Sequence, residues 1–426
     1  MSEIPSSHSL SDSEARVMAL CDALFDDTLA LTRDLVGQYS VLGQESGALE
    51  TMRGWFERLG LPVEQVAMDD PELHRHPHYA PAPWSSQGRY NLVSRLNPDS
   101  SRPHLVFNGH MDVVPAEPTD MWTQPPWTPW QQDGWLYGRG AGDMKAGIAA
   151  MTMAVHAVRE AGVAIDFPLT LQTVIEEECT GNGALACVNC GYAGDFVLIP
   201  EPFGARIYSG QIGVLRFRIR VNGVPAHVLD TGAGSNAIEY LQAMIPYLKA
   251  LEEELNAAPR EAPYDAIPHP FNLNIGQFEG GNWASSVPAH AILEGRLGFA
   301  PEMSPETAMR KLTEAVDRAH AELKGNVDAP SVEFHGFRSE GHLVDLESEG
   351  VRLLGDCHRS LTGSDPEHYL STCTTDLRAF HVAAGVAGTC YGPVAERIHG
   401  VDECVDIESI RHVLKTYALF ICRWGG

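Results

Sequence analysis

The chain has 426 residues, of which 44% are hydrophobic, so it can build more than one hydrophobic core and we expect two domains. Its 30 Lys and Arg residues against 56 Asp and Glu residues give a formal net charge of −26, which argues against nucleic-acid and anionic-membrane partners. No stretch approaches the roughly 20 apolar residues of a membrane span, and residues 1–5 lack signal-peptide features, so we expect a cytoplasmic protein.

The sequence contains a pair of cysteines and a cluster of histidines that could bind a metal ion, but we expect neither to do so. Cys187 and Cys190 have the C-x-x-C spacing, but the nine cysteines form no second such pair, and we interpret both as structural thiols. His74, His76 and His78 lie in a Pro-rich stretch that has the composition of an exposed loop.

At the start of the chain, apolar residues at helical spacing predict a helix over residues 12–36 and a second one over 47–59. The apolar run 105–107 then ends abruptly in Asn-Gly-His-Met-Asp, the pattern of a buried strand that delivers side chains to a sheet edge. The imidazole of His110 can bind a divalent cation, and a nearby carboxylate can orient it, a role we assign to Asp112.

A glycine-rich turn follows at residues 138–147 and leads into a predicted helix over 148–159. It matches neither the Walker pattern nor the dinucleotide pattern, so a phosphate cradle is disfavoured. Asp143 projects from the junction of turn and helix, where its carboxylate is suited to a cation.

Two further predicted strands, 169–175 and 196–199, also end in acids: Glu176, Glu177 and Glu178 after the first, Glu201 after the second. The carboxyl ends of parallel strands share one edge of an α/β sheet, so these residues can converge with His110. One imidazole among several carboxylates predicts a divalent-metal site, and His399, in a Gly-flanked loop, can supply a second imidazole.

These motifs, taken together and in this order, resemble the co-catalytic zinc amidohydrolase and peptidase family that includes acetylornithine deacetylase, succinyl-diaminopimelate desuccinylase, aminoacylase and carboxypeptidase G. The resemblance implies two divalent metal ions, zinc with cobalt or manganese as alternatives. Its implied ligands are His110 and Glu201 for one ion, Glu178 and His399 for the other, and Asp143 as the bridge. It further implies that Asp112 orients His110, that Glu177 is the general base, and that a cis peptide follows Asp143. Many members have Asp where this chain has Glu176.

The middle of the chain has the β-α-β-β-α-β order of a ferredoxin-like insert, with strands at 214–221, 271–278, 289–299 and 331–337 and helices at 236–255 and 305–323. In the family such an insert is a lid and dimerisation domain, and the resemblance implies a homodimer. It also implies that His227 stabilises the oxyanion in a neighbouring subunit. Asn282 and Arg296 resemble residues of the acetylornithine deacetylase-like branch, where they would bind substrate.

We therefore expect an α/β protein with an α/β/α catalytic domain around a mixed sheet, residues 1–212 and 339–426, and the inserted lid domain, 213–338. The expected activity is metal-dependent hydrolysis of an N-acyl bond on a small amino-acid derivative. Three alternatives stay open: a di- or tripeptidase or carboxypeptidase, a one-metal hydrolase of an aromatic amine or N-formyl amine, and a non-catalytic binding protein.

Overall fold

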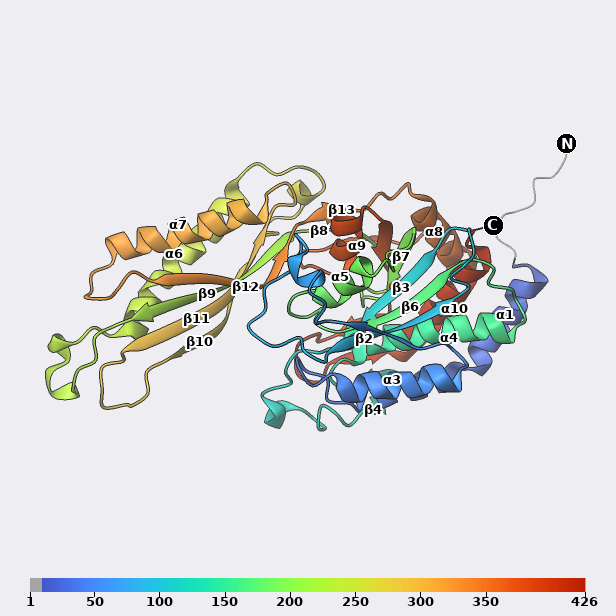
Figure 1. The fold of residues 1–426 in the computed structure, drawn as a ribbon, viewed down its shortest axis with the longest axis horizontal. Coiled ribbons are helices and arrows are strands. Elements are labelled where there is room, and N and C mark those ends of the chain that lie inside the picture. Colours follow the sequence, from blue (N-terminus) through green and yellow to red (C-terminus); the bar gives the residue numbers. More distant parts are fainter. Residues whose placement is uncertain (1–9, 426) are drawn as a thin grey trace.

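The computed structural model describes residues 10–425, so residues 1–5, in which the sequence shows no signal-peptide features, lie outside the described part. A mixed sheet lies within the larger part of the molecule (Figure 1). It has six strands, in the order β1-β2-β6-β3-β7-β15. Its strands are β1 (Glu64–Ala67), β2 (Tyr90–Leu96), β6 (Leu169–Val174), β3 (Leu105–His110), β7 (Phe196–Ile199) and β15 (Ala387–Cys390). The four strands from β6 to β15 are parallel, and β1 and β2 run antiparallel to their neighbours.

Helices cover both faces of this sheet. One face packs against α4 (Ala146–Glu160) and α10 (Ile407–Arg423), and the other against α5 (Asn182–Asn189) and α9 (Leu377–Ala384). On the first face, the absent side chain of Gly109 lets α4 approach, because a Cβ there would lie 2.8 Å from Cγ1 of Ile148. Around them lie α1 (Asp12–Ala23), α2 (Phe25–Val36), α3 (Ser46–Arg58) and α8 (Glu349–Thr362).

The predicted helix over residues 12–36 is wrong in one respect, since it is two helices, α1 and α2, that meet at Leu24. The backbone of Leu24 leaves the helical region at φ −94°, ψ 7°. The reason is tertiary packing: both helices contact α4, but α1 also lies against α10, whereas α2 also lies against α3.

The second part of the molecule projects from the first at the left of Figure 1 and has its own hydrophobic core. Its antiparallel sheet has the order β10-β11-β9-β12, covered by α6 (Ala237–Ala257) and α7 (Pro305–Glu322). The strands are β9 (Gly213–Asn222), β10 (Leu273–Gly280), β11 (His290–Phe299) and β12 (Ser331–Ser339). The predicted fold class is thus confirmed, and the domain boundaries at residues 213 and 338 stay predictions.

Two small sheets complete the fold. One joins β13 (His342–Leu343), β8 (Ile207–Gln211) and β14 (His368–Leu370); the other joins β16 (Ala395–Glu396), β17 (Cys404–Asp406), β5 (Trp135–Tyr137) and β4 (Trp130–Gln132). The second of these places the loop after β16 beside the glycine-rich turn that follows β5. Among the residues described, no helix is both long and apolar enough to cross a lipid bilayer.

Candidate active site

The parallel strands β6, β3 and β7 end on one edge of the large sheet, and each end carries acidic or imidazole groups. His110 is the last residue of β3, Glu177 and Glu178 follow β6, and Glu201 follows β7. The start of α4 lies close to the end of β7, since a Cβ on Gly147 would lie 2.4 Å from the carbonyl oxygen of Pro200. The turn before α4 is thereby held next to these strand ends.

His110, Asp143 and Glu201 form the first group of potential ligands, each offering one atom within 4.8 Å of the others. The Nε2 atom of His110 lies 3.0 Å from Oδ1 of Asp143. Asp143 comes from the turn Ala141–Lys145, and its peptide bond to Met144 is cis, as the resemblance implies.

Asp143, Glu178 and His399 form the second group by the same distance criterion. His399 Nε2 lies 3.0 Å from Oε1 of Glu178 and 3.5 Å from Oδ2 of Asp143. The two carboxylate oxygens of Asp143 therefore face different histidines, which is the arrangement that a bridging carboxylate requires. The His399 side chain is 51% exposed, so the group opens to solvent on this side.

The charges around these ligands favour a bound cation. Burial raises the pKa of Glu201 well above its usual value, and the Asp143 carboxylate raises it further. The neighbouring Glu178 raises the pKa of His399 to about 11, against the effect of burial. Buried carboxylates at such density repel one another unless a cation is present, and imidazole with carboxylate is a donor set that zinc accepts. The residues present therefore fit a divalent metal centre.

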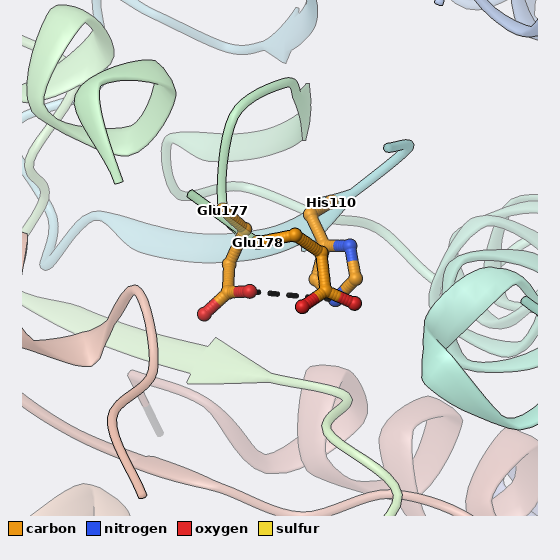
Figure 2. Close-up of side chains that lie close together, drawn as sticks. All are labelled: His110, Glu177 and Glu178. Carbon is orange, nitrogen blue, oxygen red and sulfur yellow. Dashed lines mark ion pairs between the residues drawn. The ribbon is translucent and has the colours of Figure 1, made fainter. Parts of the chain in front are cut away.

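Glu177 lies beside the two groups without being needed in either. Figure 2 shows its carboxylate directed toward His110, with Oε2 4.0 Å from Nε2 of His110, and Glu178 next to both. Burial raises the pKa of Glu177 well above its usual value, and Glu201 adds to that rise while His110 opposes it. His110, Glu177 and Glu178 are close enough to form a third ligand group, so distance alone does not separate base from ligand. The first two groups use all five predicted ligands and leave Glu177 free.

Asp112 acts on this site differently from the prediction. Its main-chain carbonyl, not its carboxylate, accepts the hydrogen bond from Nδ1 of His110, at 2.9 Å, and the nearest carboxylate oxygen lies 3.9 Å away. The carboxylate instead accepts the main-chain N–H groups of Glu177, at 3.2 Å, and Glu178, at 3.0 Å. The side chain spans the gap to the next strand end because β3 and β6 are adjacent.

The turn after β6 contains a buried anchor that the sequence analysis did not explain. Glu176 has φ +69° and is almost fully buried. Its carboxylate accepts hydrogen bonds from Trp84 Nε1 at 2.8 Å, from Thr180 Oγ1 at 2.7 Å and from Arg89. These partners hold the start of the acidic turn, and nothing in the local spacing indicates them, because Trp84 and Arg89 are about ninety positions away.

The three lid residues that the resemblance singled out lie in two places. Arg296, on β11, is half-buried at the junction with the catalytic domain, where its Nη2 donates to the main-chain oxygen of Thr372 at 2.9 Å. His227 and Asn282 are exposed and follow the far ends of β9 and β10. Arg216, the residue of β9 that contacts Glu178, lies six residues before the far end of this strand, a distance of about 20 Å. The single chain therefore does not bring His227 and Asn282 to the ligand groups.

Arg216, which the sequence analysis passed over, links the lid to the ligands. It lies on β9, and its Nη2 donates to the main-chain oxygen of Glu178 at 2.6 Å, while its guanidinium lies 5.1 Å from the ring centre of Phe337. Arginines alternate along this strand, and the sequence does not indicate which of them contacts the site. They are Arg216, Arg218 and Arg220.

The cysteines and histidines that were expected to have no ligand role are not part of a ligand group. Within residues 10–425, neither the cysteines at 187 and 190 nor the histidines at 74, 76 and 78 belong to a cluster of three potential metal ligands. Cys187 is buried in α5, and both thiols are free.

Fold and site together define a metal-dependent hydrolase. A family model described as "Peptidase family M20/M25/M40" matches residues 106–423, well over half of the sequence. The chain therefore belongs to the M20/M25/M40 peptidase family, whose members are metallohydrolases of amide and peptide bonds.

Individual relatives agree with this assignment. The chain is 29% identical to a succinyl-diaminopimelate desuccinylase of Delftia acidovorans, covering 91% of this chain and 96% of that protein. It is 28% identical to an N-formyl-4-amino-5-aminomethyl-2-methylpyrimidine deformylase of Bacillus subtilis, covering 79% and 83%. These similarities point to desuccinylases and deformylases rather than specifically to the predicted acetylornithine deacetylase branch. The fold matches that of the di-peptidase Dug1p from Saccharomyces cerevisiae with a TM-score of 0.82 and 17% identity, covering 98% of this chain and 99% of that one.

Proposed function

We propose that this protein is a two-metal amidohydrolase that cleaves the N-acyl bond of a small amino-acid derivative to give an amine and a carboxylate. The observation that carries the proposal is the pair of ligand groups that share Asp143, with the buried Glu177 left over beside them. Strongly raised carboxylate pKa values cluster at catalytic sites, so the buried Glu177 beside these groups favours an enzyme over a non-catalytic binding protein.

His110 and Glu201 would hold one metal ion, Glu178 and His399 the other, and Asp143 both. Zinc fits the donor set, with cobalt and manganese as alternatives. Two such cations supply the Lewis acidity that polarises a carbonyl oxygen and makes a water acidic enough to lose a proton near neutral pH.

The chain's own groups would handle the proton and the substrate. Glu177 takes a proton from the attacking water and passes it to the departing nitrogen, for which a raised pKa is suited. The carboxylate of Asp112 fixes the backbone between base and ligand through the N–H groups of Glu177 and Glu178. His227 of a second subunit, with Asn282, would complete the site by contacting the oxyanion and the substrate, so the active form is a homodimer.

Arg296 supports a substrate that carries a carboxylate. Its guanidinium is half-buried at the lid junction, near Arg216 on the neighbouring strand. A relative named as a desuccinylase acts on a substrate whose acyl group has a free carboxylate, which agrees with an N-acyl amino acid or an N-succinyl amine. The second candidate is hydrolysis of an N-formyl amine, which the deformylase relative favours.

The test is metal analysis of the purified protein, followed by hydrolysis of N-succinyl, N-acetyl and N-formyl amino acids and dipeptides after metal reconstitution. We expect about two metal ions per chain and turnover of an N-acyl amino acid. The Glu177→Gln variant should keep both ions and lose about 10³-fold in kcat, whereas Glu396→Gln, an exposed residue, should behave like wild type. Wild-type turnover by Glu177→Gln would remove Glu177 from the mechanism, and one ion with turnover only of N-formyl amines would favour the second candidate.

A further inference from the structure

The carboxylate of Glu403 is buried and is not one of the potential metal ligands. It accepts four hydrogen bonds from the turn that contains Asp143. Glu403 is 1% exposed. Its Oε2 accepts hydrogen bonds from Arg139 Nη1 at 2.6 Å and from the N–H of Gly140 at 3.0 Å. Its Oε1 accepts those of Gly142 and Asp143, both at 3.0 Å. These four donors occupy the lone-pair positions of one ionised carboxylate, so the turn is built around an anion.

The conformation and close packing of this turn depend on its glycines. Gly140 has φ +78°, and a Cβ on Gly142 would lie 2.5 Å from Cβ of Ala395. The N–H of Asp143 is itself one of the four donors, so the position of this bridging residue depends directly on Glu403.

Glu403 also ends the loop that carries His399. His399 and Asp402 have φ values of +63° and +55°, which non-glycine residues rarely adopt without support. The support comes from the loop's far end, where Asp402 accepts the N–H and Oγ1–H of Thr123 at 2.8 Å each. Beside it, the main-chain oxygen of Glu403 accepts the N–H of Gly138 at 3.0 Å. The loop of His399 and the turn of Asp143 thus meet at one residue.

We propose that Glu403 is a positioning residue for the metal centre. It holds the turn of Asp143 and the loop of His399 together, and it thereby sets the distance between these two ligands in the group that they form with Glu178. It touches neither substrate nor metal and acts through the backbone of both segments. The inference rests on the proposed function, in that it needs the predicted metal centre, but it does not depend on which substrate is hydrolysed.

The test is the zinc affinity of Glu403→Gln, measured by competition with a chromophoric chelator. The substitution keeps the shape but replaces one oxygen acceptor by an NH₂ group, which then faces two donors. Loss of an outer-shell partner of this kind typically costs 10- to 100-fold in metal affinity, and we expect a loss of that order. Glu396→Gln, the same change at an exposed residue near His399, should leave the affinity at the wild-type value.

Two further measurements separate positioning from general stabilisation. A merely structural role would lower the thermal stability of the metal-free protein but leave the zinc affinity and the visible spectrum of the cobalt-loaded protein unchanged. Positioning predicts an altered cobalt spectrum and recovery of kcat at high zinc concentration. If Arg139, left buried without its partner, prevents folding of the single variant, the double variant Arg139→Gln with Glu403→Gln removes the uncompensated charge and is measured in its place.

The outcomes distinguish this inference from the proposed function. A folded variant that binds two zinc ions with wild-type affinity and an unchanged cobalt spectrum would overturn the role of Glu403 and leave the function intact. A wild-type protein that binds no zinc, cobalt or manganese would overturn the proposed function and this inference together.

Discussion

Individual hydrogen bonds determine which atoms of the site are available to a cation. The carbonyl oxygen of Asp112 can only accept, so Nδ1 of His110 carries the proton of the neutral ring. Nε2 is then left with a lone pair, and it is this atom that lies near Asp143. A single main-chain contact thereby selects the tautomer that can bind metal.

A half-buried histidine away from the ligand groups, His412, gives a prediction about pH. Burial lowers its pKa to about 4, helped by His358 and Lys415, and Tyr391 Oη lies 2.7 Å from its Nε2. The unfolded histidine titrates near 6.5, so the unfolded chain binds more protons between pH 4 and 6.5 and stability falls as the pH is lowered through that window. We expect His412 to account for about 2 kcal/mol of the loss between pH 6.5 and 4.5.

Chemical denaturation at several pH values tests this expectation. The His412→Gln variant retains a hydrogen-bonding group for Tyr391 but cannot titrate, so its unfolding free energy should depend less on pH by about one proton over this range. His368→Gln, at an exposed position, serves as the control. An undiminished pH dependence in His412→Gln would contradict the assignment.

At the scale of the elements, strand β9 connects the lid to the metal ligands through Arg216. The hydrogen bond from its guanidinium to the carbonyl of Glu178 is charge-assisted and of a kind worth about 1.5–3 kcal/mol. Arg216→Met should therefore loosen the turn after β6, and we expect amide exchange in residues 178–181 to become about tenfold faster or more.

Hydrogen exchange followed by mass spectrometry measures that change. Arg218→Met is the matched control, since Arg218 lies on the same strand and pairs with Glu294 instead. Equal exchange rates in both variants would show that the Arg216 contact does not restrain the turn.

At the scale of the whole molecule, the domain that contains β9 extends away from the catalytic domain (Figure 1). His227 follows the far end of β9, about 20 Å along the strand from Arg216, which contacts Glu178. If His227 acts in the partner subunit of a homodimer, Glu177→Gln and His227→Ala should each be inactive alone and complement each other when mixed. The mixed dimer has one site with both residues intact, so a 1:1 mixture at equilibrium should recover about a quarter of wild-type activity. Light scattering gives the oligomeric state, and no recovery from a mixture shown to exchange subunits would place His227 outside the shared site.

The sequence by itself determined the class of fold and the candidate ligands. Apolar runs that end in His110, Glu178 and Glu201 indicate strand ends directly, because the length of an apolar run and the polar residues that end it are local features of the sequence. The β-α-β-β-α-β order of the lid was likewise readable from periodicity, and its sheet order β10-β11-β9-β12 is that of a ferredoxin-like unit.

Only the tertiary structure decided how these groups are held. The two oxygens of Asp143 facing different histidines, the carbonyl rather than the carboxylate of Asp112 on His110, and the contact of Arg216 with Glu178 all depend on side-chain directions across neighbouring elements. The break at Leu24 and the four hydrogen bonds to Glu403 have the same origin. Contacts between residues that are distant along the chain form only when the elements pack, so local spacing predicts which residues reach the sheet edge but not how they are oriented there.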